Sequence, residues 1–376
     1  MAGLYIHIPF CKQACHYCNF HFSTSLQLKE PVIQAILKEL KIQKNYLKGE
    51  ALDSIYLGGG TPSLLTKKEL SALFEQIYTI HKVKKDAEIT LEANPDDLTK
   101  KKIADLKDSP VNRLSIGIQS FFDHDLKFMN RAHNAQEAKE CLENVQNAGF
   151  SNLTIDLIYG SPTTTQQQWI QNIEIALSYK IPHISCYCLT VEPQTALAHF
   201  VKKGKVTPPD DEKAALQFET LIQKLTEIGY EHYEISNFAK KGYIAKHNSN
   251  YWRHVKYLGI GPSAHSFDGK SRQWNIPNNS QYVKALDQKK AFFEKEILTT
   301  DQAYNEYILT GLRTKWGCDK EKIAHFGQKY LRHFDQEVKR LLSKRWVQEK
   351  NNIFTLTNQG KLVADRVALE LFIDIV

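Results

Sequence analysis

Two patterns of hydrophobic positions alternate along the first 240 residues. Short runs rich in Ile, Leu and Tyr are typical of buried β-strands, and the stretches between them have the apolar spacing of amphipathic helices. Strands are predicted at 4–8, 54–59, 88–93, 113–118, 153–160 and 183–191. Strands that alternate with helices in this way predict a parallel sheet joined by helical crossovers.

The ends of several predicted helices carry capping residues. Thr66 and Glu69 have the spacing of a capping box, and Asn134 can cap the helix that follows it. Asp210 or Asp211 can start a further helix. These capping residues start helices in the gaps between the predicted strands, so the helix and strand predictions are consistent.

The predicted strands are almost continuously apolar, which favours a sheet covered on both faces. We therefore expect an α/β fold with a partial (β/α)6 barrel, whose ligands would bind at the carboxyl ends of the strands. The unusual residues of this region follow that rule, and they are the GGGTP turn at 58–62, Glu92, Gln119 and Asp156.

After residue 240 the composition and the hydrophobic periodicity of the chain change twice. Residues 241–297 are rich in Gly, Asn, Tyr and His and show no sustained period, so we expect an irregular cap or connecting segment. Residues 298–376 read as helices, a hairpin and a last helix, which resembles a mainly helical winged-helix-like domain. The predicted domains are thus 1–240, 241–297 and 298–376.

Composition and charge narrow the class of protein. The chain has 376 residues, 42% of them hydrophobic, which is enough for a globular core. Its net charge of +7 is scattered rather than gathered in one block, so charge does not indicate nucleic acid. The basic stretch 339–346 raises that possibility for the last domain, but Asp335 and Glu337 beside it favour packing or docking.

Signals for export and membrane insertion are missing from the sequence pattern. The chain starts directly with a strand, and no apolar run reaches the length of a membrane helix. Its seven cysteines are an odd number, and four of them are dispersed, which argues against a secreted disulfide framework. We expect a cytoplasmic protein that is not an integral membrane protein.

Three cysteines follow the first predicted strand at close spacing: Cys11, Cys15 and Cys18. Three thiolates on a short loop can hold three irons of a four-iron cluster and leave the fourth iron open to another ligand. A zinc site completed by His16 or His21, or a set of core thiols, is the alternative.

Cys186 and Cys188 lie two residues apart in a predicted strand, so they would face the same side. A second metal or redox pair is conceivable there. Small apolar residues in a buried strand are the favoured interpretation.

The cysteine spacing and the glycine-rich turn together resemble the radical S-adenosylmethionine (SAM) superfamily. Within it, the chain is similar to the group of oxygen-independent coproporphyrinogen III oxidases and related haem chaperones. The resemblance covers most of the chain and rests on seven motifs in order: YIHIPFCxxxCxYCxF, GGGTPS, EANP, NRLSIGIQSF, NRAH, DLIYGSP and HNSNYW.

The resemblance implies a [4Fe-4S] cluster on the three cysteines, with SAM bound to the open iron. The residues it implies for SAM are Tyr5, Tyr17, Gly59, Gly60, Thr61, Glu92, Gln119, Arg131 and Asp156. Glycines without a Cβ would let the backbone approach the ligand, although a tight strand-to-helix turn would also need them. Carboxylates could accept ribose hydroxyls, and Arg131 could bind a carboxylate.

The segment HNSNYW at 247–252 implies haem binding. Its candidate residues are His247, Asn248, Tyr251 and Trp252, although a histidine in such a loop is also a common structural residue. Partners would be haem and a haem-accepting protein of the respiratory, membrane-associated kind, without nucleic acid.

Two functions follow from the resemblance, a haem chaperone and an oxidase that decarboxylates coproporphyrinogen III. The oxidase resemblance implies a fourth cysteine where this chain has Phe20, and an extension ahead of the first strand, which here begins at Leu4. With HNSNYW present, the chaperone is favoured, and the machinery for reductive SAM cleavage is expected to be retained.

Overall fold

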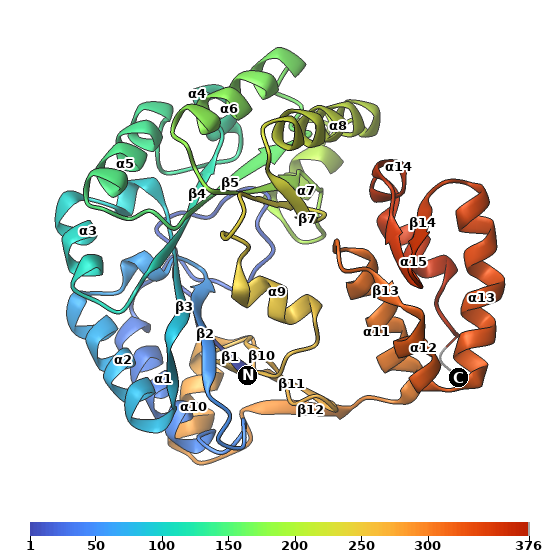
Figure 1. Ribbon diagram of the computed structural model, residues 1–376. Coiled ribbons are helices and arrows are strands. Elements are labelled where there is room, and N and C mark those ends of the chain that lie inside the picture. Colours follow the sequence, from blue (N-terminus) through green and yellow to red (C-terminus); the bar gives the residue numbers. More distant parts are fainter. Residues whose placement is uncertain (375–376) are drawn as a thin grey trace.

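The computed structural model describes residues 1–374 and is built around one 12-stranded sheet. Its order is β12-β11-β10-β9-β1-β2-β3-β4-β5-β6-β8-β7. The central strands pair in parallel and curve into an open wheel (Figure 1). They are β1 (Ala2–Ile8), β2 (Leu52–Gly59), β3 (Val83–Ala93), β4 (Arg113–Gln119), β5 (Leu153–Tyr159) and β6 (His183–Cys188). The predicted partial (β/α)6 barrel is confirmed.

Helices lie around the outside of this wheel (Figure 1). They are α1 (Lys29–Ile42), α2 (Lys67–Ile80), α3 (Lys100–Lys107), α4 (Asp123–Phe128), α5 (Ala135–Asn147), α6 (Gln166–Ser178), α7 (Ala196–Lys202) and α8 (Asp211–Glu227). Short 3-10 turns at Pro62–Leu64 and Pro95–Asp97 follow β2 and β3. The capping box of Thr66 with Glu69 and the cap at Asn134 are confirmed, and Asp210 caps α8.

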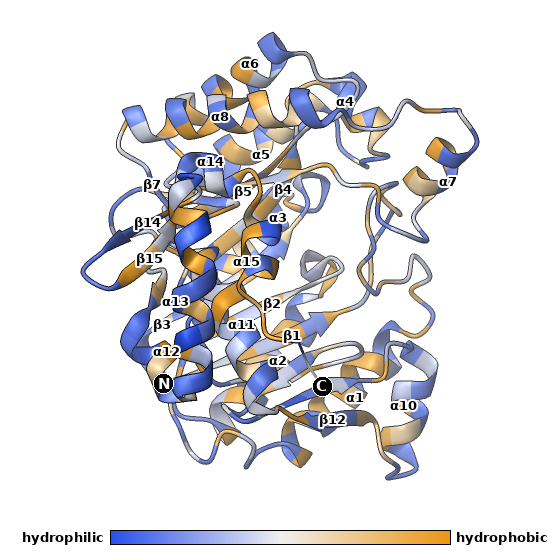
Figure 2. Ribbon diagram, turned by 90° about the vertical axis from the view of Figure 1, so that its right-hand side faces the viewer, coloured by the Kyte–Doolittle hydropathy of each residue, from blue (hydrophilic) through white to orange (hydrophobic). Residues whose placement is uncertain are grey.

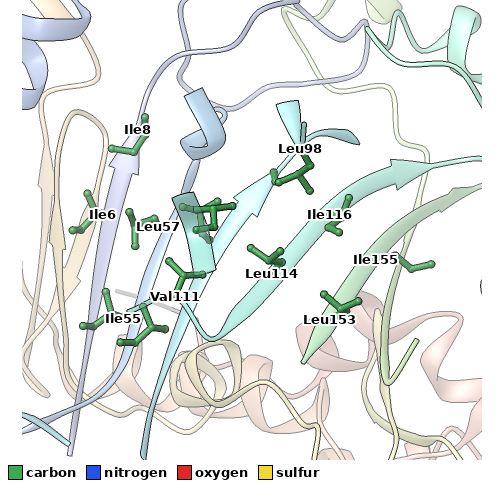
Figure 3. Close-up of a cluster of buried hydrophobic side chains, with 14 of the residues drawn as sticks. Ile6, Ile8, Ile55, Leu57, Leu98, Val111, Leu114, Ile116, Leu153 and Ile155 are labelled. Atoms are coloured by element: carbon green, nitrogen blue, oxygen red, sulfur yellow. The ribbon is translucent and has the colours of Figure 1, made fainter. Parts of the chain in front are cut away.

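Side chains alternate along the strands between two faces. Figure 3 shows the outward-facing set, in which Ile and Leu side chains from neighbouring strands pack in one cluster. The residues between them are polar, as in the register Tyr5–Tyr56–Thr90–Arg113. The expectation of a sheet covered on both faces is confirmed, because almost every residue of these strands is buried, although the inner face is lined by polar side chains.

The segment 241–297 is more regular than its composition predicts. It forms α9 (Lys246–Trp252), β9 (Tyr257–Ile260), β10 (His265–Phe267), β11 (Ser271–Asn275), α10 (Asn279–Asp287) and β12 (Phe293–Ile297). Strand β9 pairs in parallel with β1, and β10 to β12 continue the sheet antiparallel. The expectation of an irregular segment was wrong, since the edge of β1 supplies the hydrogen bonds that order it.

On the other side of the barrel, β7 (Glu231–Glu234) and β8 (Asn237–Ala239) complete the sheet. Strand β8 pairs antiparallel with β6 only over His183–Ser185, and β6 ends at Cys188 rather than at 191 as predicted.

The C-terminal part packs around a separate apolar cluster that includes Tyr304, Phe334 and Phe354. Its elements are α11 (Thr300–Leu312), β13 (Cys318–Asp319), α12 (Lys320–Phe326), α13 (Gln328–Ser343), β14 (Val347–Lys350), β15 (Ile353–Leu356), α14 (Asn358–Lys361) and α15 (Ala364–Glu370). Figure 2, which faces this part, shows hydrophilic and hydrophobic residues alternating along α13. The predicted helices and hairpin of a mainly helical domain are confirmed.

Among the described residues, no helix combines the length and the apolar character that crossing a membrane requires.

Candidate functional site

The cysteine loop follows β1 and is fixed to the end of β2 by backbone hydrogen bonds. The N–H of Gly60 donates to the carbonyl of Ile8 at 2.9 Å, and the N–H of Thr61 donates to that of Phe10 at 2.7 Å. A Cβ on Gly60 would lie 2.6 Å from the Ile8 oxygen, so only glycine fits. The glycine turn therefore positions the loop, whichever ligand it also approaches.

Three free, half-buried thiols lie on this loop, those of Cys11, Cys15 and Cys18. Burial raises the pKa of Cys11 to about 11 and also raises that of Cys18. Thiols must lose their protons to bind iron, so binding would release protons.

Within residues 1–374, no group of three or more His, Cys, Asp or Glu side chains is arranged around a single metal ion. Thiolates that each hold a different iron of a cluster do not need to converge on one point. The lack of a single-metal arrangement is therefore compatible with a cluster on these three thiols.

Arg131 links the cysteine loop to two strand ends. Its Nη1 donates to Sγ of Cys15 at 3.3 Å, and its Nη2 donates to Oδ1 of Asn94 at 2.6 Å and to the Gly117 carbonyl at 2.8 Å. Its Nε is buried without a hydrogen-bond partner. A ligand carboxylate could accept this unpaired donor, which fits an amino-acid moiety at the mouth.

Asn94 was missed by the sequence reasoning, although it lies inside the EANP motif. Its Nδ2 also donates to Oγ1 of Thr61 at 3.2 Å, so it joins the glycine turn to Arg131. Tyr17, on the cysteine loop, is half-buried, and burial raises the pKa of its hydroxyl.

Two carboxyl groups face the inside of the barrel near its mouth. Glu92 accepts a hydrogen bond from Tyr56 at 2.6 Å and from the Gly59 N–H at 3.1 Å. Burial raises the pKa of Glu92, and burial together with the charge of Glu92 raises that of Asp156 to about 7. A cationic ligand between them would restore their ionised forms.

Gln119 ends β4 in the left-handed region, with φ 67°. Its Nε2 would be 3.0 Å from a Cβ at Gly117, so its side chain folds back over that glycine beside Arg131. The structure thus gathers Cys15, Gln119 and Arg131 at one mouth, as the strand ends predict.

Tyr5 lies deeper in the barrel than the cysteine loop. Its ring stacks on Tyr56 at 6.2 Å between centroids, and its hydroxyl is 2.9 Å from Nδ1 of His7. Arg113 and His183, further along the inner face, are both fully buried and both bond to Thr154. In the sequence, polar residues at alternate positions along the strands could have identified this polar interior.

The HNSNYW segment forms α9 and is divided between two environments. His247 is 1% exposed, and its Nδ1 and Nε2 lie 2.9 Å from Oγ of Ser54 and 2.8 Å from the hydroxyl of Tyr251. Its ring stacks on Tyr56 at 5.1 Å, and burial lowers its pKa to about 3. His247 and Tyr251 thus face the interior of the barrel, away from the cysteine loop.

Trp252, at the end of α9, lines a cavity of about 730 Å³ between the barrel and the C-terminal domain. Asn248 is half-buried. The tertiary structure therefore places His247 beside the candidate SAM residue Tyr5, with ring centroids 6.4 Å apart, and Trp252 at this separate cavity.

Cys186 is buried in the main apolar cluster, and Cys188 packs partly buried against it. Both cysteines thus lie in the environment of small apolar strand residues, and this is the interpretation that the sequence favours.

Sequence comparison agrees with this arrangement. Residues 5–176 match the profile of the Radical SAM superfamily, and residues 298–363 match that of the HemN C-terminal domain. The fold and the matches define a radical SAM protein.

Curated relatives match along nearly the whole chain. Proteins named "Heme chaperone HemW" are 35% identical in Bacillus subtilis and 33% identical in Escherichia coli, over 98% and 99% of this chain and 98% of each relative. The relative of the same name in Lactococcus lactis is 33% identical over 98% of this chain and 97% of its own. The chain belongs to the HemW family of haem chaperones.

A solved structure shares the complete fold. The coproporphyrinogen III oxidase HemN of Escherichia coli, described as a radical SAM enzyme, superimposes with a TM-score of 0.84 over 99% of this chain and 90% of its own. The two sequences are 22% identical, so this likeness establishes the fold.

Proposed function

We propose that this protein binds haem and hands it to an acceptor protein, and that it carries a SAM-bound [4Fe-4S] cluster in a supporting role. The observation that carries the proposal is the similarity along 98% of the chain to proteins named as haem chaperones. The acceptor would be of the respiratory, membrane-associated kind. The expected cytoplasmic location is part of the same proposal.

The cluster would be held by the thiols of Cys11, Cys15 and Cys18. When bound, such a cluster can supply the electron for reductive cleavage of SAM. The free donor at Arg131 supports a SAM carboxylate at the mouth, and the raised pKa values of Glu92 and Asp156 support a cation between them. The other residues proposed to border SAM are Tyr5, Tyr17, Gly59, Gly60, Thr61 and Gln119.

We infer that the residues of the HNSNYW segment have two different roles. His247 and Tyr251 bond to each other and to the barrel, so they would hold α9 in place. Asn248 and Trp252 would then act from that helix, and the cavity beside Trp252 supports a role in haem binding.

The alternative is an oxygen-independent coproporphyrinogen III oxidase, which the fold shared with HemN favours. Position 20 argues against it, because Phe20 is 68% exposed on the cysteine loop where the oxidase resemblance implies a fourth cysteine.

Anaerobic reconstitution followed by haem titration tests the proposal. We expect the wild-type protein to bind haem and to leave coproporphyrinogen III unchanged in a parallel decarboxylation assay. Trp252→Ala should weaken haem binding, whereas Trp346→Ala, in the C-terminal hairpin region, serves as its control. Decarboxylation without haem binding would refute the chaperone proposal.

A further inference from the structure

A small cavity lies between the last strand of the barrel sheet and the C-terminal domain. Its volume is about 160 Å³, below the roughly 300–1,000 Å³ of sites for drug-sized ligands. Strand β7 forms one side, and the turn after α11, the hairpin of β14 and β15 and the helix α14 form the other (Figure 1, Figure 2). None of the candidate SAM or haem residues is among the described residues that line it.

The walls of this cavity carry more positive than negative charge. Arg313, Lys315 and Lys361 line it, and Glu234 is the one acidic residue among the described residues of the lining. Lys315 pairs with Glu231, and Arg313 pairs with Glu234 at 3.3 Å. Lys361 pairs with no carboxylate within residues 1–374. One positive charge of the cavity is therefore left uncompensated.

Lys361 is held in place by an uncharged partner. Its Nζ lies 3.0 Å from Nδ1 of His232, and Nε2 of His232 lies 3.0 Å from the carbonyl of Ile235. Because a carbonyl only accepts, Nε2 carries the proton and Nδ1 accepts from the lysine. Burial, together with the charge of Lys361, lowers the pKa of His232 to about 3, so its ring stays neutral. The imidazole thus supplies a lone pair but no negative charge.

The ammonium group of Lys361 can donate to a further acceptor. It carries three N–H donors, of which one is used by His232 and one makes a long contact of 3.4 Å with Oδ1 of Asn358. Burial lowers the pKa of Lys361 to about 8, so the group is mostly protonated at pH 7. Because buried lysines are rarely left without an anionic partner, a ligand that supplies negative charge would complete these surroundings.

Arg313 offers a second donor at the same cavity. Its two terminal nitrogens are in use, since Nη2 pairs with Glu234 and Nη1 lies 3.4 Å from Oδ1 of Asp365. Its Nε is buried and has no hydrogen-bond partner among the described residues. A buried N–H without an acceptor has a cost in free energy. An anion with several oxygens could accept from this donor and from Lys361 at once.

We propose that this cavity binds a small oxyanion of the phosphate or carboxylate class, held by Nζ of Lys361 and Nε of Arg313. The anion lies between β7 of the barrel sheet and α14 of the C-terminal domain, so its binding strengthens the contact between the two. The site goes beyond the proposed function, because it uses none of the residues proposed to bind SAM or haem.

Isothermal titration of the full-length, anaerobically reconstituted protein at pH 7 and constant ionic strength tests this site. Sodium phosphate and sodium acetate are the two probes, and sodium chloride is the reference. Lys361→Met should weaken oxyanion binding by about 10- to 100-fold, because it removes a hydrogen bond from a charged donor. Lys361→Gln, which stays polar without the charge, should weaken it as well. Lys339→Met, at an exposed lysine of α13 outside the cavity, loses the same charge and should bind like the wild type.

Thermal unfolding of the same proteins gives a second measurement. The bound oxyanion should raise the Tm of the wild type and of Lys339→Met, and it should leave that of the two Lys361 variants unchanged. Binding of phosphate alone would identify a phosphate site, and binding of acetate alone a carboxylate site. If neither anion binds more tightly than chloride, or if both Lys361 variants bind as the wild type does, the site is refuted.

Discussion

At the scale of single residues, polar side chains in buried positions determine what the barrel can do. Glu39 of α1 is fully buried and accepts hydrogen bonds from the Gly261 N–H at 2.8 Å, from Asn275 at 2.7 Å and from Tyr282. It thereby ties the segment after β9 to a helix far away in the sequence. Such a carboxyl group has a measurable cost when it ionises.

Glu39 should make stability depend on pH. Burial raises its pKa from 4.5 to about 7 in the folded protein. Because the folded state then binds the proton more tightly than the unfolded state, the contribution of Glu39 to stability falls as pH rises from about 4.5 to 7 and is constant above. The free energy of unfolding of wild type, minus that of Glu39→Gln, should decrease by on the order of 3 kcal/mol over this range in urea titrations. A difference independent of pH would contradict the assignment.

Gly60 should be required for the cysteine loop. A Cβ there would lie 2.6 Å from the Ile8 oxygen and 2.7 Å from the Phe10 nitrogen, and backbone atoms cannot move aside cheaply. We expect Gly60→Ala to destabilise the protein by about 1–3 kcal/mol or more and to lower its iron content after reconstitution. Gly242→Ala meets no atom within 4 Å but puts alanine at φ 88°, so it should cost about 1–2 kcal/mol from backbone strain alone and keep the iron. Equal iron contents would count against this role.

At the scale of elements, helix α9 is capped by a residue of another element. Ala245 precedes the helix and has no side-chain cap, so Glu88 of β3 accepts the N–H groups of Lys246 and His247, each at 2.9 Å. Glu88 is 7% exposed and lies 3.9 Å from Arg113. The start of α9 is thus held by the inner face of the barrel.

Glu88→Ala should loosen α9. The substitution leaves two backbone donors without their acceptor and removes the carboxylate beside the buried Arg113, so we expect a loss of about 2 kcal/mol or more in urea unfolding. Amide hydrogen exchange in 246–252 should accelerate, while exchange in α2 should not change. Glu294→Ala, at an exposed strand position, should stay within about 0.5 kcal/mol of wild type. Unchanged protection of α9 would show that the cap does not hold the helix.

At the scale of the whole molecule, a small set of contacts joins the barrel to the C-terminal domain. The Ile235 N–H donates to the Arg313 carbonyl at 3.0 Å, and the Lys315 N–H donates to that of Tyr233 at 2.9 Å. Nη2 of Arg313 lies 3.3 Å from Oε1 of the buried Glu234. These contacts attach the segment after α11 to β7 and to the turn that follows it.

Arg313→Met should weaken this junction in a pH-dependent way. Burial raises the pKa of Glu234 and Arg313 lowers it, so the variant leaves a buried acid without its cation. We expect a loss of roughly 3 kcal/mol at pH 8 and a smaller one at pH 5, where Glu234 can take up a proton. Arg366→Met, which breaks a 3.5 Å pair of an exposed arginine, should cost at most about 1 kcal/mol. Calorimetry that finds equal losses at both pH values would contradict the role of the pair.

The sequence by itself determined the local features of this protein. The order of strands and helices up to residue 240, the caps at Thr66, Asn134 and Asp210, and the spacing of the three cysteines all depend on neighbouring residues, so periodicity and side-chain chemistry were enough to predict them. The motifs also led to the correct family.

Only the tertiary structure decided which distant residues meet. That Arg131 lies on Cys15 and Asn94, that β9 pairs with β1, and that His247 is enclosed under Tyr56 depends on strand register and on packing between elements far apart in the chain. A shift of one residue turns a side chain from one face of the sheet to the other, and spacing along the chain does not contain that information.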